Sequence, residues 1–348
     1  MVTREKRRAA WPVRAAGMGL AMVVFLFLLP LLLLPGREGE EEPLPTATLP
    51  VAEPSAAAVE GVSPVEGWDE SQRLRLLTVE GTVEELSLGD YLWGVTAAEM
   101  PASFELEALK AQTVAARTYC LYQREGGGEK HPGADVCGDY TCCQAYLTRE
   151  QAEAGWGVDA WRYGEKISQA VAETDGLVCL YGGEPIDAVF FSSAAGRTAD
   201  ALAVWGTEVP YLKGVESPEG EEVPGWQTVV TIPRGEFAET LLAAYPQAEL
   251  GGEAGGWIQG LTADEAGMVT SIRIGGVEMS GGQARSLFGL RSAHFTAEAA
   301  EEGVTFRVTG YGHGVGMSQY GANAMAGEGK SFQEILEWYY SGAKVGEM

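Results

Sequence analysis

The sequence predicts an α+β fold in which mixed helices accompany an antiparallel-rich sheet, preceded by one transmembrane helix and a disordered tether. Helical and strand-like segments follow one another without the strict alternation that a parallel βαβ fold requires. Of the 348 residues, 46% are apolar and 9% aromatic, which is enough for a folded core. The N-terminal 66 residues have a different composition, with an apolar run and then a proline- and glutamate-rich stretch.

The charge balance excludes one broad class of function. Lys and Arg total 24 and Asp and Glu total 49, so the formal net charge is −25. A surface of that sign repels a phosphate backbone, and we therefore expect no nucleic-acid partner. Five cysteines in a chain of this length are too few for a disulfide scaffold.

Residues 1–14 form a basic tail and residues 15–35 an apolar run without charge. As a helix rising about 1.5 Å per residue, the run is long enough to cross a hydrocarbon core of roughly 30 Å. Because the cations precede it, the N-terminus is expected in the cytoplasm and the main domain outside a single-pass cell membrane anchor. A cleaved signal peptide is the alternative, but the run ends Leu-Leu-Leu-Leu-Pro-Gly-Arg-Glu, a poor cleavage site.

Residues 36–66 are expected to be an extracytoplasmic tether, because five prolines and seven glutamates leave little apolar surface to bury. The folded domain is expected over residues 67–348. Alternation and turn residues predict strands at 73–79, 177–181, 186–192, 228–232, 269–274 and 304–308. Helices are predicted at 86–95, from about 103 to 123 with Ser103 as N-cap, and at 151–174, 236–244 and 332–340.

Glu99 is the first candidate for chemistry. It stands in Ala97-Ala98-Glu99-Met100-Pro101, between apolar residues and just before the long helix. A carboxyl group in such a setting is partly desolvated, which raises its pKa and suits it to donate a proton near neutral pH. On the long helix, Lys110 and Arg117 share a face at helical spacing and are candidates to bind a polyol or a carboxylate. The plainer alternative is that Glu99 decorates a helix end and both cations are solvated.

The second candidate site is a cluster of one histidine and three cysteines within 13 residues: His131, Cys137, Cys142 and Cys143. This donor set fits a closed tetrahedral zinc site, and four protein ligands would make the metal structural. A disulfide is the alternative for a domain outside the membrane. The two other cysteines, Cys120 and Cys179, are expected to be buried packing residues.

A third candidate is the glycine-rich segment Gly310-Tyr-Gly-His-Gly-Val-Gly-Met-Ser-Gln-Tyr-Gly-Ala. Glycines at alternate positions allow unusual backbone angles or a close approach to a ligand. The spacing fits neither a dinucleotide-binding turn nor a P-loop. The segment holds His313, Ser318 and Gln319, and it is either a binding loop or a tight structural turn.

These residues resemble a known family. The stretch from Tyr91 to Tyr119, with Trp-Gly-Val-Thr-Ala-Ala-Glu-Met-Pro and Ala-Gln-Thr-Val-Ala-Ala-Arg-Thr-Tyr, is similar to the opening block of the stage II sporulation protein D family, also called the amidase-enhancer family. Phe191-Ser-Ser-Ala-Ala-Gly-Arg-Thr, Gly281-Gly-Gln-Ala-Arg-Ser-Leu-Phe-Gly-Leu-Arg-Ser and the glycine-rich segment resemble its later blocks. The resemblance spans about residues 70–345 and keeps the order of the blocks.

The resemblance implies a peptidoglycan lytic transglycosylase of sporulation that works in forespore engulfment. The catalytic glutamate of the family falls on Glu99, which would cleave bonds between N-acetylmuramic acid and N-acetylglucosamine in denuded glycan and leave 1,6-anhydro ends. It also implies that Ser192, Ser193, His313 and Gln319 line the glycan groove. The implied partners are glycan strands, the amidase stage II sporulation protein P and the membrane protein stage II sporulation protein M.

Some members of the family carry a zinc loop with two histidines and two cysteines. His131, Cys137 and Cys143 match that pattern, whereas Cys142 stands where a histidine would be. No cofactor is needed for the chemistry itself. Two other functions stay open: a non-catalytic, wall-binding activator of an N-acetylmuramoyl-L-alanine amidase, and a zinc hydrolase whose turnover depends on the metal.

Overall fold

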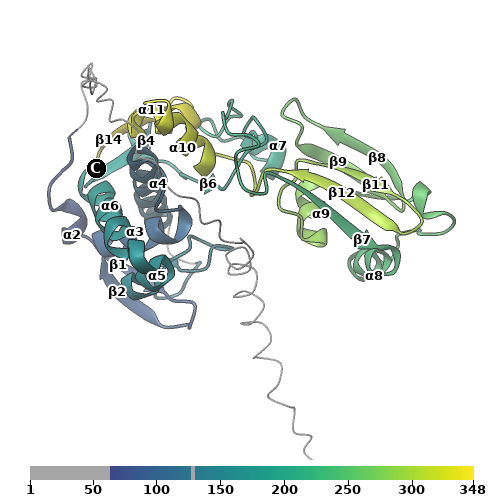
Figure 1. Ribbon diagram of the computed structural model, residues 1–348, viewed down its shortest axis with the longest axis horizontal. Coiled ribbons are helices and arrows are strands. Elements are labelled where there is room, and N and C mark those ends of the chain that lie inside the picture. The colour runs from purple at the N-terminus through teal and green to yellow at the C-terminus, as the bar shows by residue number, and fades with distance from the viewer. Residues whose placement is uncertain (1–62, 127–129) are drawn as a thin grey trace, which may run out of the picture. The chain divides into compact units, whose positions relative to one another are not determined.

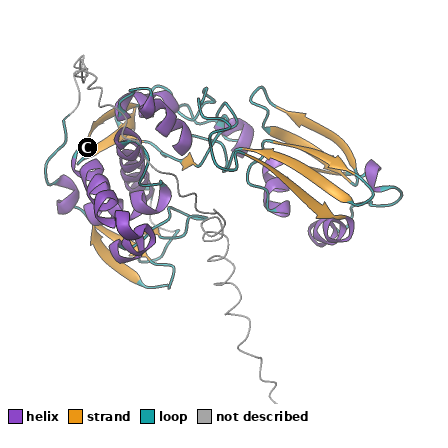
Figure 2. Ribbon diagram, viewed as in Figure 1, coloured by secondary structure: helices purple, strands orange, loops and turns teal. Residues whose placement is uncertain are grey.

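The computed structural model describes residues 63–126 and 130–348. Within them, helices and short sheets are mixed along the chain, as Figures 1 and 2 show, and this confirms the α+β class. No helix in these ranges is both long and apolar enough to cross a bilayer. The predicted basic tail, the anchor 15–35 and the tether as far as residue 62 lie outside the described residues.

One long helix, α4 (Leu106–Glu125), lies at the centre of a helical lobe, formed by the described residues of 63–226 and 310–348. Every residue of α4 from 108 to 121 is buried. The elements that contact it include α3 (Leu88–Glu99), α6 (Ala160–Ala172), α10 (Gln319–Gly327), α11 (Phe332–Tyr339) and strand β4 (Leu177–Tyr181). Any polar side chain on such a helix must find its partners inside the protein.

Three small sheets complete the helical lobe. The first orders β2 (Val83–Ser87), β1 (Arg73–Leu77) and β3 (Val136–Cys137), the second orders β14 (Lys344–Glu347), β4 and β5 (Glu184–Pro185), and the third pairs β13 (Met317–Ser318) with β6 (Phe190–Phe191). The pairs β1–β3 and β6–β13 are parallel and the others antiparallel. The shorter helical segments are α2 (Trp68–Ser71), α5 (Arg149–Trp156), the 3₁₀ turn η2 (Gly157–Asp159) and α7 (Ala201–Trp205).

Residues 227–309 form a sheet lobe with its own core. Its antiparallel sheets order β10 (Val277–Met279), β9 (Val269–Ile274) and β8 (Ile258–Ala263), and β11 (Phe295–Ala299), β12 (Gly303–Thr309) and β7 (Gln227–Pro233). Helices α8 (Arg234–Ala244) and α9 (Gly281–Phe288) pack on these sheets, and the turn η3 (Ala254–Gly256) precedes β8 (Figure 1). Phe237, Phe288 and Phe306 join the layers, with ring centroids 4.6 Å apart for the first two and 5.4 Å for the last two.

The predicted strands agree with the structure where alternation or apolar runs were clear. The strand predicted at 177–181 is β4, and that at 269–274 is β9. The strand predicted at 186–192 is wrong in extent, because only Phe190 and Phe191 pair with a neighbour. Ile186 and Ala188 belong instead to the main core, so their apolar character reflects burial without pairing.

Three predicted helices are corrected. Ser103 is not an N-cap, since α4 begins at Leu106 after a turn closed by Phe104 N–H donating to Pro101 C=O. The helix predicted over 151–174 is divided at Gly157, whose φ of 56° ends α5 before α6 begins. Glycine accepts that left-handed angle without a Cβ clash. The helix predicted at 86–95 instead runs from Leu88 to Glu99, so Glu99 is the last residue of α3.

A buried ion pair joins α4 to the start of the domain. Arg117 is fully buried, and its Nε and Nη2 lie 2.8 and 2.5 Å from the two carboxylate oxygens of Asp69 on α2. Its Nη1 donates to the carbonyl of Leu177 on β4 at 2.9 Å. Burial raises the pKa of Asp69, and the charge and hydrogen bonds of Arg117 oppose that rise. The pair therefore holds together three elements that would otherwise each bury an unpaired charge or carbonyl.

Removing one member of this pair should strand its partner in the core. We expect Arg117→Ala to lower the free energy of unfolding by about 3–5 kcal/mol, because Asp69 then stays buried without its counter-charge. The control is Arg75→Ala, which breaks an exposed pair with Asp135 and should leave the unfolding midpoint nearly unchanged. Urea unfolding followed by circular dichroism measures both, and equal midpoints for the two variants would contradict the structural role.

Candidate functional site

Glu99 is held at the C-terminal end of α3 by the residues around it. The helix begins at Ser87, whose hydroxyl accepts the backbone N–H of Asp90. It ends because Pro101 disfavours helical angles at Met100, which is extended with φ −126° and ψ 136°. The carboxyl group of Glu99 is therefore carried by the last helical residue, at the edge of the lobe core.

The surroundings of Glu99 favour a carboxyl group that can both give and take a proton. The side chain is half-buried, and the backbone N–H of Ala145 donates to its Oε1 at 2.5 Å. Burial raises its pKa, while the hydrogen bonds from Ala145 and from the side chain of Gln319 oppose that rise. No charged group in residues 63–126 or 130–348 contributes to the shift, so desolvation favours the acid form.

Gln319, the first residue of α10, links Glu99 to α4. Its Nε2 donates to Oε1 of Gln112 at 3.3 Å, and Gln112 is itself fully buried. The Nε2 of Gln112 has no hydrogen-bond partner among the described residues. The two amides thus form a polar path from the core to the carboxyl group, with one donor unused.

The glycine-rich segment brings Gln319 to Glu99 because it lies directly against residues 189–194. Gly310, Gly312, Gly314 and Gly316 all have positive φ, between 78° and 123°. A Cβ at Gly312 would stand 2.6 Å from the Cβ of Phe191, and one at Gly316 would overlap the carbonyl of Val189. The glycines are therefore required for backbone packing, and the segment delivers Ser318 and Gln319 to the start of α10.

Ser192 and Ser193, which the resemblance places in the glycan groove, lie beside this segment and contact it through their backbones. The backbone of Ser193 exchanges two hydrogen bonds with Tyr311, at 3.0 and 2.8 Å, and the carbonyl of Ser192 accepts from the N–H of Tyr320. Ser193 is buried. Contact of either hydroxyl with a glycan stays a prediction.

Glu219 is a buried acid that sequence reasoning missed. Its Oε1 accepts the backbone N–H of Ala194 at 2.6 Å and the hydroxyl of Ser318, and its Oε2 accepts the hydroxyl of Ser217 at 2.5 Å. Ser217 also bonds the hydroxyl of Tyr339 at 2.6 Å. These bonds tie the segment around residue 194 to the N-cap of α10. Apart from Ser217, the residues of this network are distant from Glu219 in sequence, so no local signal reveals it.

His313 is half-buried and neutral. Its Nε2 lies 3.0 Å from the carbonyl of Phe190, and its Nδ1 accepts the N–H of Val315 at 3.2 Å. Burial lowers its pKa to about 4. Both ring nitrogens are engaged, so only the ring face and edge remain for a ligand. The ring packs against Trp205 and Phe191, with centroids 5.6 Å away in each case.

Lys110 and Arg117 do not form a glycan-binding face, which corrects the prediction made from helical spacing. Arg117 is enclosed by its ion pair with Asp69. The ammonium group of Lys110 lies 2.7 Å from Glu107 and 2.5 Å from Glu173, and the residue is buried. Because α4 is surrounded by other elements, the face that the two cations share is turned into the protein.

The four residues of the histidine and cysteine cluster come together as predicted. One ligand atom from each of His131, Cys137, Cys142 and Cys143 lies within 4.8 Å of the others. His131 Nε2 is 3.2 Å from the sulfur of Cys143 and 3.6 Å from that of Cys142. Metal bonds of about 2.0–2.3 Å to nitrogen and sulfur would fit this spacing. All five cysteines are free thiols, and Cys120 and Cys179 are buried as predicted.

Comparison with known proteins identifies relatives that share this part of the chain. A family model described as "SpoIID: Stage II sporulation protein" matches residues 78–181, which contain Glu99, α4 and the histidine and cysteine cluster. Stage II sporulation protein D of Bacillus subtilis (strain 168) is 37% identical over 271 residues, 78% of this chain and 77% of that protein.

Two further relatives show the range of the similarity. Stage II sporulation protein D of Bacillus amyloliquefaciens is 37% identical over 272 residues, 78% of this chain and 77% of that protein. The amidase enhancer of Bacillus subtilis (strain 168) is 30% identical over 305 residues, 73% of this chain but only 40% of that longer protein. The extent and identity of these matches show that the chain belongs to the stage II sporulation protein D family.

Proposed function

We propose that the chain is a lytic transglycosylase that cleaves denuded peptidoglycan strands during sporulation. The observation that carries this proposal is the half-buried carboxyl group of Glu99, whose pKa is raised by burial. Among the described residues no charged neighbour stabilises its anion. The names of the relatives support the setting, since they refer to sporulation and to enhancement of an amidase.

In the proposed reaction one carboxyl group performs both proton transfers. Glu99 begins protonated and donates its proton to the oxygen of the bond between N-acetylmuramic acid and N-acetylglucosamine, which breaks as positive charge develops on the muramic ring. The resulting carboxylate then takes the proton of the muramic 6-hydroxyl, whose oxygen closes a 1,6-anhydro ring. The proton count balances, and neither a second carboxylate nor water is consumed.

The surrounding amides assist this cycle. The N–H of Ala145 and the side chain of Gln319 hold the carboxyl group in place and stabilise the anion formed after proton donation. Binding of the glycan by Ser192, Ser193 and the ring of His313 is part of the proposal.

The histidine and cysteine cluster is proposed to hold zinc in a structural role. Three thiolates and one imidazole would complete a tetrahedral shell and leave no open position for substrate. His131 precedes β3 and Cys137 is its last residue, whereas Cys142 and Cys143 lie in the loop before α5. Because that loop also contains Ala145, the metal would stabilise the loop that donates to Glu99.

The proposed cellular setting follows the N-terminal sequence. A cytoplasmic tail, one membrane anchor and a tether would hold the folded domain outside the cell membrane, facing the wall. An amidase and a further membrane protein, corresponding to stage II sporulation proteins P and M, are the partners we propose.

A non-catalytic activator of an amidase is the second candidate, and the name of the amidase enhancer favours it. An activator would need the folded surface but not the acid of Glu99. The two functions therefore differ in what a substitution of that one carboxyl group does.

The first prediction concerns Glu99 itself. On peptide-free glycan, Glu99→Gln should reduce the formation of anhydro-muramic ends by roughly 10²–10⁴-fold, because the amide cannot donate the proton. Mass spectrometry of the products measures this, and Glu150→Gln, an exposed change on α5, is the matched control. Anhydro ends at the wild-type rate from Glu99→Gln would leave the activator function in its place.

The second prediction is a pH dependence. The acid form of Glu99 is active, so its activity is present below the pKa of Glu99 and is lost as the pH rises through it. Since the Gln319 hydrogen bond lowers that pKa, Gln319→Leu should raise it and move the alkaline limb of the kcat/KM profile to higher pH. An unmoved or acid-shifted limb would show that this bond does not tune the carboxyl group.

The third prediction concerns the metal. The purified domain should contain one zinc ion, and Cys142→Ala should lose it while Cys179→Ala, a buried thiol in β4, retains it. Chelation should lower the Tm before it affects turnover of the folded protein. If chelation abolished turnover with the Tm unchanged, the zinc hydrolase reading would replace the structural role.

A further inference from the structure

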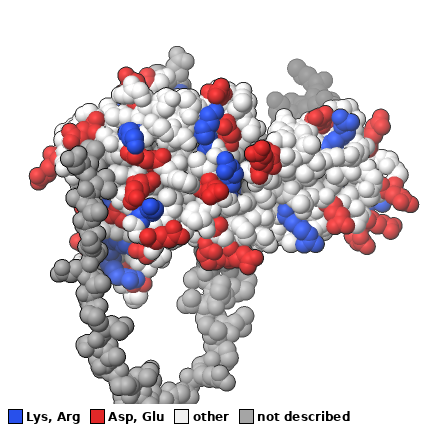
Figure 3. Space-filling model, turned by 90° about the horizontal axis from the view of Figure 1, so that it is seen from above, with Lys and Arg blue, Asp and Glu red and all other residues white. Residues whose placement is uncertain are grey.

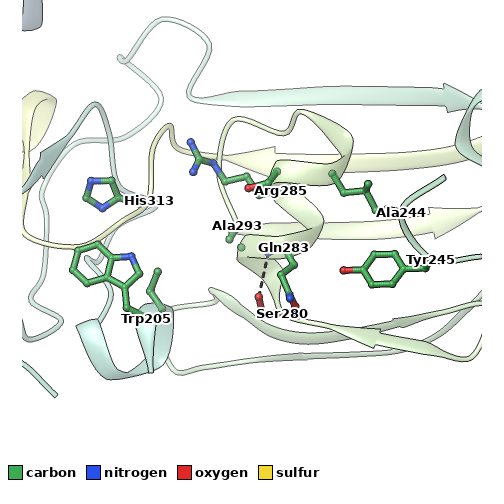
Figure 4. Close-up of a pocket in the computed structure, with 12 residues that line it drawn as sticks. Trp205, Ala244, Tyr245, Ser280, Gln283, Arg285, Ala293 and His313 are labelled. Atoms are coloured by element: carbon green, nitrogen blue, oxygen red, sulfur yellow. Dashed lines mark hydrogen bonds between the residues drawn. The ribbon is translucent and has the colours of Figure 1, made fainter. Parts of the chain in front are cut away.

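We propose that a second site, distinct from Glu99, binds an acidic sugar of the glycan through the guanidinium of Arg285 and the indole of Trp205. The inference rests on the proposed action on glycan and names a place where the strand is held. Trp205, at the end of α7, and Arg285, on α9, line one cavity of about 630 Å³ (Figure 4). Cavities of this size commonly hold small ligands. Glu99 does not line it.

Arg285 is the group that makes this cavity specific for an anion. It is half-buried, and its Nε donates to the carbonyl of Arg291 at 3.2 Å, which orients the guanidinium. Figure 4 shows the guanidinium directed toward the side of the cavity where His313 and Trp205 lie. In residues 63–126 and 130–348 no carboxylate pairs with Arg285. Its two terminal nitrogens are free to hold a carboxylate in a bidentate manner.

Arg285 differs from the buried cations of the helical lobe in having no acidic partner among the described residues. The net charge is −25, and the face in Figure 3 carries more acidic than basic side chains. The buried cations of α4, Lys110 and Arg117, both have carboxylate partners within the protein. Arg285 is half-buried and has none in the part of the chain that the structure describes, so an anionic ligand would supply the missing charge.

Trp205 gives the cavity an apolar wall suited to a sugar ring. Asp200 caps α7 by accepting the N–H of Leu202, and Gly206 ends the helix with φ 74°, so the position of the indole is defined. Trp205 is 45% exposed, and its ring packs on the ring of His313. Because both nitrogens of His313 are already bonded, this wall presents ring surface and no competing charge.

The far side of the cavity supplies neutral polar groups. Gln283 uses its Oε1 to accept the N–H of Ser280 at 2.8 Å, which leaves its amide nitrogen for a ligand. Tyr245 places its hydroxyl toward the same space (Figure 4). An aromatic wall, neutral hydrogen-bonding groups and one unpaired cation together match a sugar that carries a single carboxylate. In denuded glycan that group is the lactyl carboxylate of muramic acid.

Calorimetric titration of Glu99→Gln protein, in which the glycan stays uncut, tests the site with three probes. These are chitotetraose, a peptide-free tetrasaccharide of alternating N-acetylglucosamine and N-acetylmuramic acid, and the same tetrasaccharide with its stem peptides. We expect the peptide-free muramic probe to bind roughly tenfold more tightly than chitotetraose, because only it offers Arg285 a sugar carboxylate. Adding Arg285→Gln should abolish that preference. Adding Trp205→Ala should weaken the binding of both the peptide-free muramic probe and chitotetraose.

The matched control is Arg234→Gln, an exposed change on α8 of the same lobe that removes the same charge and should preserve the preference. A preference that survives Arg285→Gln would overturn the assignment. An Arg285-dependent preference for the peptide-bearing probe would overturn it too, since the carboxylate would then belong to the peptide. If none of the three probes bound, the proposed action on glycan would itself fail. Equal binding of all three probes would instead overturn only the assignment of this second site.

Discussion

The close approach of residues 310–318 to residues 189–194 is the constraint on which both candidate sites depend. Side chains at Gly312 or Gly316 would collide with this neighbouring backbone and its Cβ atoms, so only glycine lets the two segments meet. Their contact forms the parallel pair β6–β13 and places Gln319 beside Glu99. It also packs the ring of His313 against that of Trp205, at the wall of the second cavity.

The buried side chain of Glu219 stabilises the contact between these two segments. A buried carboxylate is costly unless hydrogen bonds surround it, and Glu219 accepts from Ala194, Ser217 and Ser318. Gly321 leaves room for the network, since a Cβ there would stand 2.6 Å from Oε2 of Glu219. One acid thus serves to position a loop, while Glu99, which has fewer donors, keeps a carboxyl group that burial favours in its neutral form.

The same distinction separates the cations. Arg117 and Lys110 lie on a central helix where each has acidic partners, and they contribute to the fold. Arg285 lies at the surface of a different lobe, oriented by a carbonyl and lacking an acid among the described residues. Burial lowers the pKa of Arg285 from its ordinary value, yet a guanidinium remains charged at neutral pH. Its charge is therefore available to a ligand, whereas theirs is not.

The sequence alone determined what depends on neighbours along the chain. It predicted the α+β class, β4 and β9, the identity of Glu99 as the candidate acid, and the cluster of His131 with three cysteines, because local spacing and composition carry those signals. Only the tertiary structure decided which way α4 faces, since helical spacing shows that Lys110 and Arg117 share a face but not what covers it. It also revealed the hydrogen bonds of Glu219 and the placement of Trp205 and Arg285 around one cavity, because these residues are distant in the chain and come together only when the backbone packs.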